Sequence, residues 1–229
     1  MTVPALERVH EGTALFERTL STIDDAGLDA PSALPGWRRR QVVAHVASNA
    51  DALVNLLDWA RTGVESPMYS SPGQRAADIE AGAALPAADL RAKLAGGHAR
   101  LARELAAMPA TAWDAKVRTA KGRIVPASEV AWMRTREVWV HAVDLGAGAG
   151  LRDFPADLLR ALAGDAMAAF AAAADAPRVA LTATDTGDHW ELGTKEGSPS
   201  QVRGELAELT AYLLGRPGAA TGPPLPAWL

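Results

Sequence analysis

Two residues that bind metals and transfer protons lie one helical turn apart in the segment REVWVHAVD. Glu137 and His141 have i, i+4 spacing, which places both side chains on one face of a helix. Val130 and Met133 fall on the same stripe, so the pair is predicted to face the apolar side. A buried carboxylate is costly unless it is paired, hydrogen-bonded or bound to a metal. The two residues are therefore either an ion pair or two ligands of a metal site.

His45 supplies a third candidate ligand. In a helix predicted over residues 38–61 it shares a stripe with Val42 and Asn49, so it is expected to face the interior. Two histidines and one carboxylate are typical of an open catalytic zinc site or of the facial triad of non-haem iron. Asn49 and Asp144, each one turn beyond a histidine, are predicted to orient the imidazoles. The alternative is that the histidines are core residues satisfied by ordinary hydrogen bonds.

Composition limits the classes of function. The 229 residues are 48% hydrophobic and 22% charged, enough for one large domain or two small ones. No cysteine is present, so disulfides and a cysteine nucleophile are excluded, and thiol chemistry needs a thiol from outside. A net charge of -4 argues against nucleic acid as the partner. Without a long apolar run or a secretory signal, we expect a cytoplasmic protein that does not span a membrane.

Hydrophobic periodicity places helices in the first two-thirds of the chain. The predicted helices cover residues 4–24, 38–61, 73–83, 86–108 and about 127–145, with an irregular stretch before the last of them. Long helices joined in this way indicate an antiparallel bundle. After Gly150, a helix in DFPADLLRALAGDAMAAFAAAAD, strands in RVALTAT and HWEL, and a helix in SPSQVRGELAELTAYLLGR are predicted. The expected fold class is α+β, with a helical domain at 1–150 and a small α/β domain at 151–229.

Several stretches resemble one known family over nearly the whole chain. They are LPGWRRRQVVAHVASNADAL, GVESPMYSSPGQR, GRIVPASEVAWMRTREVWVHAVDLG, the GR of LLGRPG and PPLPAWL. In these the sequence resembles the mycothiol-dependent maleylpyruvate isomerases, which are DinB-like metalloenzymes. The resemblance implies a DinB-like antiparallel four-helix bundle with one Zn²⁺ per chain on His45, Glu137 and His141. It also implies that Arg75 and Arg216 are catalytic and that the C-terminal domain, where the match is looser, closes the active site.

The activity implied by the resemblance is a cis–trans isomerisation of maleylpyruvate to fumarylpyruvate, as in gentisate-type aromatic degradation. Mycothiol would be the thiol cosubstrate, and Zn²⁺ would favour its thiolate. The thiolate would add to the double bond, allow rotation and leave again, while the two arginines hold carboxylates or an enolate. The expected partners are mycothiol and maleylpyruvate or a related electrophile, bound by a monomer. Two alternatives remain: a mycothiol S-transferase acting on other electrophiles, and a non-enzymatic DinB-like binding protein.

Overall fold

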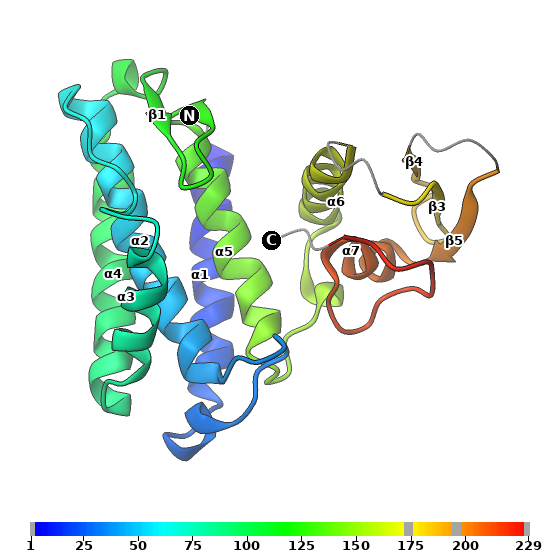
Figure 1. Ribbon diagram of the computed structural model, residues 1–229, viewed down its shortest axis with the longest axis horizontal. Coiled ribbons are helices and arrows are strands. Elements are labelled where there is room, and N and C mark those ends of the chain that lie inside the picture. The colour runs from blue at the N-terminus through cyan, green and yellow to red at the C-terminus, as the bar shows by residue number, and fades with distance from the viewer. Residues whose placement is uncertain (1–2, 172–175, 194–197, 227–229) are drawn as a thin grey trace. The chain divides into compact units, whose positions relative to one another are not determined.

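The computed structural model describes residues 3–171, 176–193 and 198–226 and divides into two compact units, residues 1–147 and 148–229. The first unit is built from four long helices and one short one (Figure 1). They are α1 (Val3–Ser21), α2 (Arg39–Thr62), α3 (Gln74–Ala83), α4 (Ala87–Ala107) and α5 (Glu129–Asp144). Single 3₁₀ turns at Ala26–Asp29 and Ala110–Ala112 lie in the connections. All five predicted helices of this unit are present, with ends that differ by a few residues.

The four long helices form the predicted four-helix bundle, with two helices running in each direction. Within it α2 and α4 run in one direction and α1 and α5 in the other, and α3 lies on the path from α2 back to the start of α4 (Figure 1). Helix α2 contacts α3, α4 and α5, while α1 packs along α5. Because α2 and α5 are antiparallel neighbours, the first half of α2 lies beside the second half of α5. This arrangement brings residues about 90 positions apart in sequence together.

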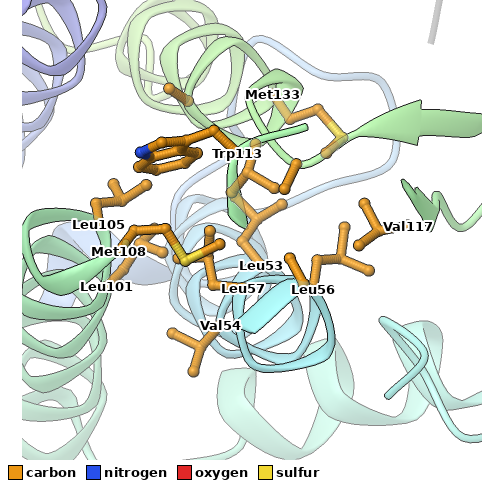
Figure 2. Close-up of a cluster of buried hydrophobic side chains, with 14 of the residues drawn as sticks. Leu53, Val54, Leu56, Leu57, Leu101, Leu105, Met108, Trp113, Val117 and Met133 are labelled. Carbon is orange, nitrogen blue, oxygen red and sulfur yellow. The ribbon is translucent and has the colours of Figure 1, made fainter. Parts of the chain in front are cut away.

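A cluster of buried apolar side chains fills one end of the bundle (Figure 2). Leu53, Leu56 and Leu57 of α2 meet Leu101 and Leu105 of α4 there, and all are nearly inaccessible to solvent. Each such side chain contributes roughly 1.5–3 kcal/mol through burial. The cluster therefore fixes α2 firmly against its neighbours at the end of the bundle distant from the predicted ligands.

The stretch before α5 is a short hairpin and not irregular chain. Strands β1 (Lys116–Arg118) and β2 (Ile124–Pro126) pair antiparallel, with Val117 opposite Val125. Gly122, with a φ of 79°, supplies the left-handed conformation in the connecting turn. Since Pro126 pairs in β2, helix α5 begins at Glu129, two residues later than predicted.

The second unit contains α6 (Ala156–Ala171), α7 (Leu206–Leu214) and a three-stranded sheet, and begins with a 3₁₀ turn at Leu151–Asp153. The sheet order is β4 (His189–Leu192), β3 (Val179–Ala183), β5 (Ser200–Gly204), with β3 antiparallel to β4 and parallel to β5. Helix α6 packs on α7.

The helix predicted over SPSQVRGELAELTAYLLGR is wrong in its first part. Residues Ser200–Gly204 form a strand, because Val202 is buried opposite Leu181 in the parallel ladder. Helix α7 begins only after Glu205, whose backbone N–H donates to the Glu208 carboxylate at 2.9 Å. None of the helices in the described parts of the chain is long and apolar enough to span a bilayer.

Candidate metal centre

Two helices bring the three predicted ligands together. His45 comes from α2, and Glu137 and His141 come from successive turns of α5. Oε2 of Glu137 lies 2.9 Å from Nε2 of His45 and 3.2 Å from Nε2 of His141. One ligand atom of each residue lies within 4.8 Å of the other two. The carboxylate is therefore shared by both imidazoles, and all three groups point to a common centre.

The two ligand-bearing helices are tied together at the end of α5. Nε of Arg39 donates to the carbonyl of Leu145 at 2.8 Å, and Nη2 donates to the carbonyl of Gly146 at 2.9 Å. These carbonyls follow the last turn of α5, where helix carbonyls lack partners within the helix. One arginine at the start of α2 thus caps the helix that carries two of the ligands.

A second tie is buried in the bundle. Arg134 of α5 is expected at the surface, as arginines normally are, but it is only 1% exposed and that expectation is wrong. Its Nη1 donates to the carbonyl of Val46 at 2.9 Å and to Oδ1 of Asn49 at 2.8 Å, both on α2. Burial lowers the pKa of Arg134 to about 10, so the guanidinium stays charged at neutral pH. Asn49 therefore holds Arg134, and its predicted role in orienting His45 is wrong.

The predicted contact of Asp144 with His141 is confirmed. Nδ1 of His141 lies 2.8 Å from Oδ2 of Asp144, which is fully buried. A carboxylate at Nδ1 retains the proton on that nitrogen and directs Nε2 toward Glu137. His45 differs, because its buried Nδ1 has no hydrogen-bond partner among the described residues. Its ring instead makes an edge-to-face contact with the ring of Trp37, with ring centroids 5.9 Å apart.

The electrostatics suit a cation at the shared centre. Burial alone would raise the pKa of Glu137, but His45 and His141 hold that pKa well below its usual range. Burial lowers the pKa of His45, and Glu137 offsets part of this effect. Burial also acts to lower the pKa of His141, yet hydrogen bonds with Asp144 and Glu137 raise it to about 9. The carboxylate of Glu137 thus stays ionised between the two imidazoles, in a buried place that a divalent cation can take.

The donor set fits a transition metal such as Zn²⁺ or Fe²⁺. Two imidazole nitrogens and one carboxylate oxygen are the ligands that catalytic sites of these ions use. Three protein ligands leave at least one coordination position for an exogenous group. Distances near 3 Å among the donors are those of a hydrogen-bonded cluster, and a bound metal would replace these contacts by coordination.

Arg75 lies at the edge of this cluster. It is the second residue of α3, and its Nη2 lies 3.5 Å from Nε2 of His45. The half-buried Tyr69 shares a side-chain hydrogen bond with Arg75, and burial raises the pKa of its phenol. Sequence reasoning missed Tyr69 and Trp37, because both lie in connections without a periodic pattern.

Arg216 belongs to the second unit. Gly215, with a φ of 64°, ends α7, and the backbone N–H of Arg216 donates to the carbonyl of Ala211 at 2.9 Å. Its Nη1 donates to the carbonyl of Leu214 at 2.7 Å. Arg216 thus folds back onto the end of α7.

Comparisons with known proteins identify the family of the chain. Residues 9–146 match the family described as the mycothiol maleylpyruvate isomerase N-terminal domain. A crystal structure of the mycothiol-dependent maleylpyruvate isomerase superimposes with a TM-score of 0.93 at 38% identity, covering 98% of this chain and 96% of that one. A mutant of that isomerase gives the same values. Among curated protein sequences no significant match is found. The chain is therefore an enzyme that belongs to the mycothiol-dependent maleylpyruvate isomerase family.

Proposed function

We propose that the chain converts maleylpyruvate to fumarylpyruvate with mycothiol as cosubstrate and one Zn²⁺ held by His45, Glu137 and His141. The convergence of these three donors beside the Arg75 guanidinium is the observation that carries the proposal. The similarity to a mycothiol-dependent maleylpyruvate isomerase along 98% of the chain supports the choice of substrates.

The chain has no cysteine, so the nucleophilic sulfur comes from mycothiol. A metal in this site supplies one thing, a lowered thiol pKa, so that the bound sulfur is a thiolate at neutral pH. The protein fixes the three donors: Asp144 orients His141, and Arg134 and Arg39 hold α2 against α5. Three protein donors would leave a coordination position for the sulfur.

The reaction needs the cis double bond to become single for a moment. The thiolate adds to an alkene carbon conjugated to a carbonyl, and the π electrons move to the carbonyl oxygen as an enolate. The carbon–carbon bond then rotates. When the electron pair returns, the thiolate leaves and the trans alkene forms, so the thiol is regenerated and no atom is gained or lost. Arg75, whose Nη2 lies 3.5 Å from Nε2 of His45, would hold a substrate carboxylate or the enolate oxygen with charge-assisted hydrogen bonds.

Arg216 is proposed as the second catalytic arginine, on the basis of the family resemblance. Arg216→Ala should keep fold and metal content and lower turnover at least about tenfold, the value of one charge-assisted contact. Arg216→Lys should restore part of the rate, since an ammonium lacks the bidentate fork. Normal kinetics of Arg216→Ala would remove this residue from the mechanism.

An assay with maleylpyruvate, with and without mycothiol, tests the proposal. We expect fumarylpyruvate to form only when mycothiol is present, with the thiol concentration unchanged at the end. Stoichiometric loss of thiol would instead indicate an S-transferase. Absence of any reaction by the Zn²⁺-loaded protein would overturn the proposed substrate.

A further inference from the structure

A polar cavity of about 280 Å³ lies in the first unit, between α2, α3 with the segment before it, and α4. We call it the Ser48 cavity. The lining side chains that matter here are Ser48, Asp51, Asn55, Gln74, Asp78 and Lys93. All of them can form hydrogen bonds, and they come from three different helices. The Ser48 cavity is therefore built from polar groups that the fold brings together, and none of them is among the three proposed metal ligands.

The buried hydroxyl of Ser48 distinguishes this cavity from an ordinary surface depression. The residue is 7% exposed, and its Oγ is buried without a hydrogen-bond partner among the described residues. Buried hydroxyls are almost always paired, because an unpaired one loses its bonds to water and gains none in return. Gln74, by contrast, bonds Asp78 at 2.6 Å and Ser70 at 3.0 Å. The unpaired hydroxyl therefore points to a partner that enters from outside the chain.

The Ser48 cavity adjoins the metal centre. Ser48 follows His45 by three residues on α2, a rise of about 4.5 Å along the helix axis. Tyr69 lines the cavity and shares a hydrogen bond with Arg75, whose Nη2 lies 3.5 Å from Nε2 of His45. A ligand in the cavity would thus lie beside residues that contact the donor set.

Charge decides which ligand the Ser48 cavity suits. Two carboxylates, Asp51 and Asp78, and one ammonium, Lys93, line it, and Asp51 also pairs with Arg100 at 3.6 Å. No excess of positive charge remains for a dianion such as maleylpyruvate, which Arg75 can hold instead. Carboxylates accept hydrogen bonds from neutral hydroxyl groups, and amides and hydroxyls both accept hydrogen bonds from them and donate hydrogen bonds to them. The lining therefore favours a neutral polyhydroxylated ligand.

Mycothiol has this chemistry, since its cysteine-derived thiol is attached to an amino sugar and an inositol. Resting on the proposed function, we infer that the Ser48 cavity binds the sugar–polyol portion of mycothiol while the cysteinyl arm reaches the metal centre. The substrate dianion and the cosubstrate then occupy separate subsites, on Arg75 and in the Ser48 cavity.

Calorimetric titration of mycothiol into the Zn²⁺-loaded protein tests this inference. Ser48→Ala removes a hydroxyl that makes no hydrogen bond to the described residues, so folding should be unaffected. It should raise the Kd for mycothiol roughly tenfold, as expected for one lost hydrogen bond. Ser48→Leu, which fills part of the cavity, should weaken binding further. Ser21→Ala changes an exposed serine at the end of α1 and is the matched control, with an unchanged Kd.

N-acetylcysteine, a thiol without the sugar and polyol, separates the cavity from the metal centre. Its affinity should be the same for the wild type and both Ser48 variants. Equal losses for both thiols would show that the substitutions act at the metal centre, and would overturn the inference. So would an unchanged Kd for mycothiol, which would leave the isomerase proposal intact. Weakened mycothiol binding by a protein that fails to isomerise maleylpyruvate would support the cavity and overturn only the substrate. If the wild type did not bind mycothiol, both proposals would fail.

Discussion

Nη1 of Arg134 on α5 lies 2.8 Å from Oδ1 of Asn49 on α2, in the buried interior of the bundle. The same nitrogen donates to the carbonyl of Val46, the residue after His45. Arg134 itself precedes Glu137 by three residues. One guanidinium therefore fixes how α2 and α5 face each other within one turn of the proposed metal ligands on both helices. A buried charge is an expensive way to join two helices, and its position suggests that it sets the geometry of the site.

Removing this tie should destabilise the bundle. Arg134→Ala leaves Asn49 without its donor and opens a void, so we expect the free energy of unfolding to fall by about 3 kcal/mol. Arg100→Ala is the control, because its pair with Asp51 is half exposed and should be worth less than about 1 kcal/mol. Urea unfolding of both variants measures the difference. If Arg134→Ala and Arg100→Ala had the same free energy of unfolding, the buried contact of Arg134 would not hold the helices together.

Asp144 should control metal affinity without contributing a ligand. Asp144→Asn keeps the size of the side chain but removes the charge that holds the Nδ1 proton of His141. Loss of such a supporting carboxylate usually costs about 10- to 100-fold in metal affinity. Competition with a fluorescent zinc chelator measures the affinity. Asp153→Asn, a change at an exposed carboxylate of the second unit, should leave it unaltered. Wild-type affinity in Asp144→Asn would show that His141 is held by its packing alone.

A histidine away from the metal centre should make the protein sensitive to acid. His98 of α4 is buried, and its Nδ1 lies 2.8 Å from Oε1 of Glu17 on α1. Burial and the nearby Arg134 lower the pKa of His98 to about 4, against 6.5 for an ordinary histidine. The unfolded chain thus takes up a proton first as the pH falls. The contribution of neutral His98 to the free energy of unfolding is therefore complete above pH 6.5. It is lost as the pH falls toward 4, by about 3 kcal/mol at most.

His98→Gln, which cannot be protonated, should remove this part of the pH dependence. The urea midpoint of the wild type should be higher at pH 7 and should approach that of His98→Gln as the pH falls to 4.5. The reason is that only the wild type loses stability when the unfolded chain takes up a proton at His98. The metal ligands titrate equally in both, so they cancel in the difference. Parallel midpoint curves would show that His98 is protonated in the folded protein without cost.

Sequence patterns predicted the parts of the site that repeat along a helix. His45, Glu137 and His141 were found because ligand-type residues lay on apolar stripes, and α2 and α5 have the helical periodicity that makes such stripes visible. Arg134 lies on the same helix, but an arginine is normally a surface residue. Only the packing of α2 against α5 shows that the acceptors of Arg134, on Val46 and Asn49, lie in the interior of the bundle.

Long-range pairing accounts for the errors in secondary structure. Ser200–Gly204 continues directly into α7 in sequence and reads as part of one helix. It becomes a strand because β3 offers a parallel partner about twenty residues earlier, which no local pattern reveals. Tyr69 likewise reaches Arg75 from a connection whose course depends on how α3 packs against α2.

Arg75 is predicted to act on the substrate and not on the fold. Arg75→Ala should lower kcat/KM for maleylpyruvate at least about tenfold, because a charge-assisted contact to a carboxylate or enolate is lost. Arg75→Lys should recover part of that loss. Arg123→Ala, an exposed arginine of the hairpin, serves as the control and should behave as the wild type. Unchanged kinetics of Arg75→Ala with normal metal content would exclude a catalytic role for this residue.

Titration of metal-free protein with Zn²⁺, while isomerisation of maleylpyruvate is followed in the presence of mycothiol, tests the central claim most directly. Only one group of three or more metal-binding side chains occurs in the described residues, so the rate should rise linearly to one equivalent of Zn²⁺ and then stay constant. His45→Ala, which removes one donor, should remain inactive throughout the same titration. Full activity of the metal-free protein, or recovery of His45→Ala with one equivalent of Zn²⁺, would contradict the account.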